Sequence, residues 1–132
     1  MKVSSIALVL LTVFATFATH AQQKTKKPAD VRILETRAIR EATRITVDGK
    51  IRVTAEKSLH GLVIVFDFRS PEKEVVTTQK AVIDEDTLET GREGVYHSEM
   101  ADTARAVNYT IRAFDIHEKE LRVANTGPFP IE

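Results

Sequence analysis

Apolar and polar residues alternate along most of the chain after residue 30, as expected for β-strands that bury one face. Between Ile45 and Ala55 the apolar residues occupy every second position, with Gly49 among them. A two-residue turn at Asp48-Gly49 would place the apolar residues of its two arms on opposite faces of the hairpin. A strand that continues through Gly49 keeps them on one face, so we expect one long strand with Gly49 as a gap or a bulge.

The segment Leu62–Phe68 is the most apolar, because Val63 and Val65 lie opposite its inward row, and we expect it in the centre of a sheet. Val75–Val82 is less apolar and is expected at a sheet edge. We expect Pro128 and Pro130 to end the last strand, because proline cannot donate to a β-ladder. The remaining predicted strands are Val31–Arg40, Val95–Met100, a strand with Val107, Tyr109, Ile111 and Ala113 inward, and a last strand with Leu121 and Val123.

About seven short antiparallel strands joined by polar turns predict an all-β fold, an immunoglobulin-like β-sandwich over residues 31–132. The chain has no cysteine and no tryptophan. A disulfide, a thiolate zinc site and a cysteine nucleophile are therefore excluded, and the domain must depend on its hydrophobic core. Because both residue types are missing, the buried Trp and the disulfide of antibody domains have no counterpart here.

The N-terminus has the pattern of a secretory signal peptide over residues 1–21. Lys2 precedes an apolar run from Ile6 to Ala18, and small residues follow near Ala21. This run is shorter than the roughly 20 residues that span a bilayer, so no membrane span is expected; a buried helix is the alternative interpretation. Residues 22–30 form a basic leader. We therefore expect a periplasmic or secreted protein.

The charge is balanced, with 19 basic and 19 acidic residues. Removal of residues 1–21 takes away only Lys2 and leaves a net charge of −1 (18 − 19). A domain without excess positive charge has no electrostatic footprint for nucleic acid, so nucleic acid is not an expected partner.

Several segments resemble the FxLYD-type domains of bacterial envelope proteins. The likeness covers roughly Ile45 to Val123, and it is found in strands and turns: Ile45–Val53, Leu62–Phe68, Leu88-Glu89-Thr90-Gly91 and Ala106–Ala113. Phe66 and Phe68 fit the motif that names the family, whereas Arg69 and Ser70 stand in place of its Tyr and Asp. The resemblance implies an immunoglobulin-like fold on an exported protein without an established catalytic role.

The residues that could carry chemistry do not form a known site pattern. His60, His97 and His117 are expected as solvated surface histidines, because metal capture needs at least three converging ligands. Asp84-Glu85-Asp86 lacks the glycine and the distal glutamate of a calcium loop and is expected as a solvated acidic loop.

Ser98, His97 and Asp102 have the residue types of a hydrolase triad, but adjacent residues on a strand point to opposite faces. We therefore expect no catalytic, cofactor-binding or metal-binding residues, no cofactor and no enzymatic activity. Asn108 begins a glycosylation sequon within a predicted strand, which is a poor acceptor.

We expect a non-catalytic interaction or accessory module of the cell envelope, in contact with another envelope protein through the edge strand Val75–Val82. The alternative is a ligand- or polysaccharide-binding domain with a cleft that the sequence does not reveal, and a cleft containing Tyr96, His97 and Asp102 would favour it. A spacer role is a third interpretation. Phe129 is expected to pack back over the open end of the sandwich rather than to anchor a partner, and the place of Tyr96 stays open.

Overall fold

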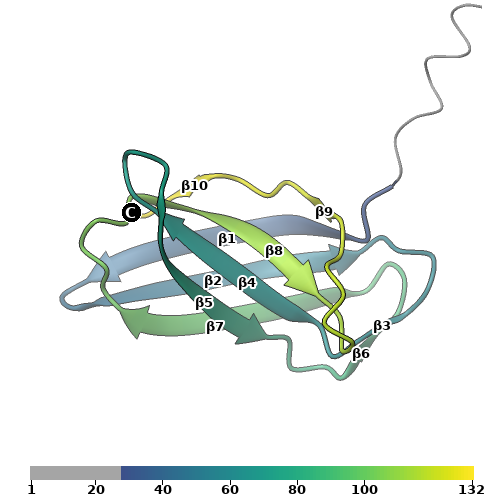
Figure 1. The fold of residues 1–132 in the computed structure, drawn as a ribbon. Helices are drawn as coiled ribbons and strands as arrows, with labels where there is room; N and C mark the ends of the chain where they lie inside the picture. Colours follow the sequence, from purple (N-terminus) through teal and green to yellow (C-terminus); the bar gives the residue numbers. More distant parts are fainter. Residues whose placement is uncertain (1–27) are drawn as a thin grey trace, which may run out of the picture.

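The computed structural model describes residues 28–132, which form ten strands and three sheets (Figure 1). The first sheet has the order β7-β2-β1-β9, from β7 (Glu93–Ala101), β2 (Arg44–Val53), β1 (Val31–Glu41) and β9 (Val123–Ala124). The second has the order β10-β8-β4-β5, from β10 (Phe129–Pro130), β8 (Asn108–Phe114), β4 (Val63–Arg69) and β5 (Val75–Val82). A short ribbon pairs β3 (Leu59–His60) with β6 (Thr87–Leu88).

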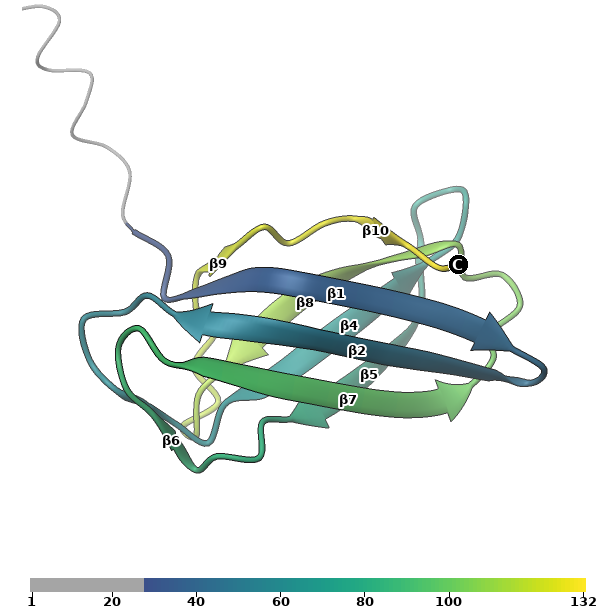
Figure 2. The same ribbon diagram turned by 180° about the vertical axis from the view of Figure 1, so that it is seen from behind.

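The predicted all-β class is confirmed for this part of the chain. Figure 2 shows β1, β2 and β7 as one layer and β4, β5 and β8 as the layer behind it. The inward side chains of both layers form one buried apolar cluster. The predicted signal peptide and most of the basic leader lie outside the described residues. Among residues 28–132, no helix has the length and apolarity needed to cross a membrane.

The strand through Gly49 is continuous, as the alternation predicts. β2 pairs with β1 on one side and with β7 on the other, and its inward residues from Ile45 to Val53 are buried. Gly49 lies opposite Tyr96, and a Cβ at Gly49 would be 2.1 Å from Cζ of that ring. The gap in the apolar row is therefore the space that the buried Tyr96 side chain fills, and burial raises the pKa of its hydroxyl.

The bulge lies in the neighbouring strand. β1 pairs Ile33 with Ile51 and then Glu35 with Lys50, so Leu34 is an extra residue in the ladder. The extra residue shifts the alternation of β1 by one position and turns Thr36 inward. The Thr36 hydroxyl lies 2.7 Å from the hydroxyl of Tyr109, in the facing sheet.

β4 is central and β5 is an edge strand of the second sheet, as predicted. The inward row of β8 is buried from Tyr109 to Ala113, but the prediction that Val107 also points inward is wrong, since Val107 is 41% exposed. The regular alternation begins only at Asn108, where β8 starts. Ala106 is buried instead.

The C-terminal segment joins the two sheets along one side of the domain (Figures 1 and 2). β9 pairs in parallel with β1, so the expectation of a wholly antiparallel arrangement is wrong. The expectation that the prolines end strand pairing is also wrong, because Pro130 lies in β10, which pairs with β8. β10 is an edge strand, where a missing N–H is tolerated. Phe129 packs back on Tyr109 as expected, with ring centroids 5.5 Å apart.

Candidate functional site

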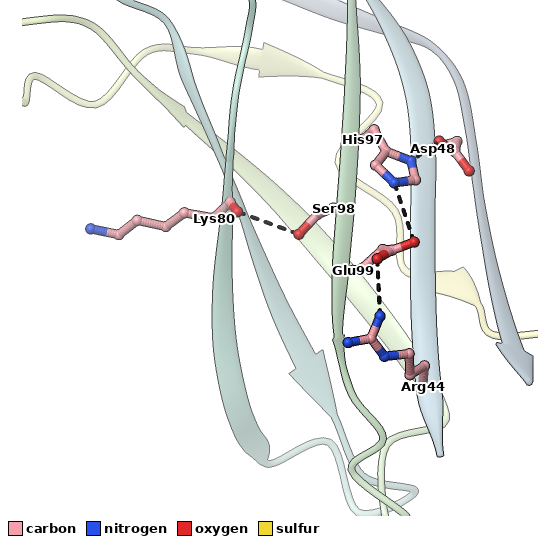
Figure 3. Close-up of polar contacts among 6 residues, drawn as sticks. All are labelled: Arg44, Asp48, Lys80, His97, Ser98 and Glu99. Atoms are coloured by element: carbon pink, nitrogen blue, oxygen red, sulfur yellow. Dashed lines mark hydrogen bonds and ion pairs between the residues drawn. The ribbon is translucent and has the colours of Figure 1, made fainter. Parts of the chain in front are cut away.

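The three residues of the apparent hydrolase triad are not brought together. His97 and Ser98 are neighbours on β7 and point to opposite sides (Figure 3). Ser98 donates a hydrogen bond through Oγ to the carbonyl oxygen of Lys80 on β5, at 3.4 Å. Asp102 accepts a hydrogen bond from Nε of Arg40 at 2.8 Å. Since Tyr96 is buried in the core, no cleft contains Tyr96, His97 and Asp102 together.

His97 belongs to a row of charged side chains on the outer face of the first sheet. Its Nδ1 lies 2.5 Å from Asp48, its Nε2 lies 3.7 Å from Glu99, and Glu99 in turn pairs with Arg44 at 3.1 Å (Figure 3). All four side chains are at least half exposed. The hydrogen bond with Asp48 raises the pKa of His97. The row is a solvated network of cross-strand polar contacts.

The other predicted surface residues are also solvated. The His60 ring lies 3.0 Å from the Thr87 hydroxyl, His117 is exposed in a turn, and Asp84, Glu85 and Asp86 are exposed. In the described part of the chain, no three histidine or acidic side chains are grouped so that they could hold a metal ion.

The outer face of the second sheet is different in composition. Outward side chains of β5, β4 and β8 lie side by side in register, because both strand pairs align at the same residues of β4. The three rows across the strands are Val82–Val63–Phe114, Lys80–Val65–Arg112 and Thr78–Asp67–Thr110. We call these residues the β4 outer face. One row is apolar, the second has a buried valine between two cations, and the third is polar.

A partly buried ion pair fixes the middle of the β4 outer face. Arg112 donates from Nε and Nη2 to the two carboxylate oxygens of Asp67, at 2.7 and 3.0 Å. The Thr78 hydroxyl donates to the same carboxylate at 3.0 Å. The Asp67 side chain is 11% exposed, and its hydrogen bonds raise the pKa of Arg112. The guanidinium is thus held in one orientation, 5.5 Å from the ring centroid of Phe114.

The β4 outer face contains a depression of about 330 Å³. Its floor is apolar, with Val63, Val65 and Phe114, and its walls are Lys80 and Arg112.

The turn after β8 forms the rim of the depression, through Asp115 and Glu118. Asp115 accepts hydrogen bonds from the backbone N–H groups of Lys119 and His117, which lower its pKa and stabilise the turn. Glu118 has a φ of 62° in this turn.

Alternation along the sequence does not reveal this site. Val63 and Val65 lie opposite the inward row of their strand, which is a signal that the second face of the strand is also covered or used. The missing information was the register that sets Val65 between Lys80 and Arg112, since those residues are far apart along the chain.

Comparisons with known proteins identify a fold but no family. No family model matches the chain, and no curated protein matches it. Among solved structures, the C-terminal domain of Wzt is similar with a TM-score of 0.51 and 7% identity, over 81% of this chain and 76% of that one. IrmA from Escherichia coli has a TM-score of 0.49 and 10% identity, over 77% and 95% of the two chains. At these identities the likeness concerns the fold alone.

A β-glucuronidase from Bacteroides uniformis has a TM-score of 0.45 and 13% identity, over 69% of this chain. The chain spans only 12% of the length of that enzyme.

Proposed function

We propose that this chain is an exported, non-catalytic immunoglobulin-like domain that serves as an interaction or accessory module of the cell envelope. A partner segment would add to the free edge of β5 as a further strand. The two-layer all-β fold, the resemblance to FxLYD-type domains and the signal-peptide pattern of residues 1–21 support this proposal.

The observation that carries the proposal is the contrast between the two sides of the domain. On one side the C-terminal segment pairs with both β1 and β8. On the other side, within residues 28–132, the eight-residue β5 has a ladder partner only in β4, and one side-chain hydrogen bond from Ser98 reaches it from β7.

The backbone groups that β5 would offer can be identified. The N–H of Ile83 donates to Leu62, so odd-numbered residues of this segment face β4. The carbonyl of Lys80 faces the opposite way, toward Ser98. The N–H and C=O groups of Thr78 and Val82 and the N–H of Lys80 are therefore directed to this edge, because residues two apart in a strand share a direction, while the Lys80 carbonyl already accepts a hydrogen bond from Ser98 of β7.

The absence of catalysis is supported by the separation of the reactive residue types. Ser98, His97 and Asp102 each contact a different partner: Lys80, Asp48 and Arg40. A nucleophile and a general base need to be within hydrogen-bond reach of each other, and this arrangement does not provide it.

The test is capture of partners from envelope extract with the immobilised domain and two variants. Thr78→Pro removes an edge-facing N–H, whereas Thr78→Ala keeps it and serves as the matched control for loss of the hydroxyl. We expect a specific protein to be recovered with wild type and Thr78→Ala and lost with Thr78→Pro, while circular dichroism shows that all three are folded. Equal recovery with Thr78→Pro contradicts the edge contact, and no recovery above background contradicts the module.

The depression on the β4 outer face favours a second candidate function, the binding of a small ligand or a saccharide. Its volume of about 330 Å³ is at the lower end of the range for small-molecule sites. An apolar floor with a few fixed polar groups is typical of such sites.

A further inference from the structure

We propose that the depression on the β4 outer face binds an acidic sugar, with the sugar carboxylate at Lys80 and Arg112 and the ring over Val63, Val65 and Phe114. This inference deepens the second candidate function and does not depend on the edge contact of β5. It rests on the chemistry of the residues that line the depression.

The cations of the wall select a carboxylate. Arg112 uses Nε–H and one N–H of Nη2 for Asp67, so three of its five N–H donors stay available. Lys80 forms no ion pair with any carboxylate of residues 28–132. Figure 3 shows its side chain extending from β5 away from Ser98. A carboxylate at this position would accept charge-assisted hydrogen bonds from two sides.

The acidic rim excludes ligands that are only anionic or only apolar. Glu118 is one of the lining residues, and its ionised carboxylate can only accept hydrogen bonds. Asp115 and Glu118 together disfavour a multiply charged inorganic anion such as phosphate more than a singly charged carboxylate. An apolar acid would remove water from the Glu118 carboxylate without donating a hydrogen bond to it, and burying a carboxylate without a donor costs free energy. A ring that carries both a carboxylate and hydroxyl groups can satisfy Lys80 and Glu118 together.

The floor fits the apolar face of a sugar ring. Val65 is 3% exposed, and Phe114 and Val63 are partly buried beside it. Asp67 holds Arg112 in place before any ligand arrives, which reduces the ordering cost of binding.

The experiment is a ¹⁵N–¹H NMR titration of the purified domain with four probes: glucuronate, glucose, benzoate and inorganic phosphate. We expect glucuronate to shift the amide signals of β4, β5 and β8, and glucose, which lacks the carboxylate, to bind about tenfold more weakly. Benzoate or phosphate binding as tightly as glucuronate overturns the assignment to an acidic sugar, and no shift with glucuronate overturns the site.

Variants locate the binding and separate it from the edge contact. Lys80→Gln should weaken glucuronate binding about tenfold, whereas Lys50→Gln, on the outer face of the other sheet, should leave it unchanged. An equal effect of the two substitutions contradicts the proposed place of the carboxylate. Lys80→Gln keeps the backbone of β5, so partner capture should persist even if glucuronate binding fails.

The same titration with an oligomer of uronic acids identifies the source of the sugar. Tighter binding of the oligomer than of the monomer assigns the site to a polysaccharide, and equal binding assigns it to the free acid.

Discussion

The two sheets present outer faces of opposite character, although both come from the same alternation of apolar and polar residues. On the first sheet, charged side chains pair across neighbouring strands, as Arg52 does with Glu93 at 2.7 Å and Arg44 with Glu99 at 3.1 Å. On the β4 outer face, an apolar row and Lys80, which forms no ion pair among residues 28–132, surround one partly buried ion pair. The first sheet satisfies most of its outward charges itself, with Lys50 as an exception among the described residues, whereas the second sheet places three apolar residues in one row beside its unpaired lysine.

The register of β2 against β7 explains the first face. It sets Asp48 opposite His97 and Arg52 opposite Glu93, so opposite charges meet in cross-strand pairs. Such exposed pairs are screened by solvent and contribute little to stability. A shallow depression of about 400 Å³ also lies around Gly49 on this sheet, where Asp48 and Lys50 border the exposed Val95.

The largest effect on the free energy of unfolding is expected for Gly49→Ala. This substitution adds a methyl group on the inward face of the first sheet, where the side chain of Tyr96 packs. The added Cβ would lie 2.1 Å from Tyr96 and 2.6 Å from the carbonyl oxygen of Glu35. We expect overpacking to lower the free energy of unfolding by about 3 kcal/mol, as measured by urea denaturation. Gly91→Ala is the control, since no atom lies within 4 Å of its added Cβ and only the left-handed φ of 85° costs about 1 kcal/mol. Equal losses would show that steric conflict with Tyr96 is not the reason for Gly49.

The next effect compares one ion pair from each outer face. Asp67→Asn should lower the free energy of unfolding by about 2 kcal/mol, less than for a fully buried pair because the Arg112 side chain is 41% exposed. Glu99→Gln on the first sheet should change it by less than about 0.5 kcal/mol. Chemical denaturation of both variants measures the difference. Similar values for the two would mean that the β4 outer face is as solvated as the other.

A smaller effect is expected when the apolar row of the β4 outer face is made polar. Val82 is 65% exposed, so Val82→Thr should alter the free energy of unfolding by less than about 0.5 kcal/mol. Val63→Thr, nearer the floor, should cost more. Thermal unfolding followed by circular dichroism measures both. A large loss for Val82→Thr would assign the row to folding rather than to ligand contact.

The smallest effect concerns the pH dependence of the first sheet. Asp48 raises the pKa of His97 in the folded chain, and Glu99 adds to the shift. The resulting stabilisation is fully present below the unfolded pKa of about 6.5 and is lost as the pH rises through the higher folded pKa. We expect wild type to have a slightly higher Tm than Asp48→Asn at about pH 5.5, and the difference to fall by about pH 9. A difference that grows with pH contradicts this linkage.

Much of the strand arrangement follows from local pattern. The apolar alternation through Gly49 is enough to predict β2, and the two-sided apolar character of residues 62–68 is enough to place β4 in a sheet centre. The phase shift at Leu34 was not predictable, because it depends on how β1 pairs with β2. Nor was the place of Pro130 in β10, since only the tertiary fold makes that segment an edge.

The candidate site was less accessible to sequence reasoning than the fold. Each outward residue of β4, β5 and β8 could be assigned a face from alternation. Their meeting as rows depends on the register between strands that are distant in the sequence, as between Val65 and Arg112. The ion pair of Asp67 is a case in point, because nothing local indicates that an aspartate in an apolar strand has a partner 45 positions later.

The C-terminal segment has a consequence for the order in which the molecule assembles. Arg122 donates its backbone N–H to the carboxylate of Asp30, 92 positions earlier, and β9 and Ile131 bond to β1 beyond it. Until residues 122–131 become available for pairing, the edge of β1 therefore lacks these bonds. Such high contact order predicts slow closure and a transient strand edge that is open to aggregation until the tail arrives.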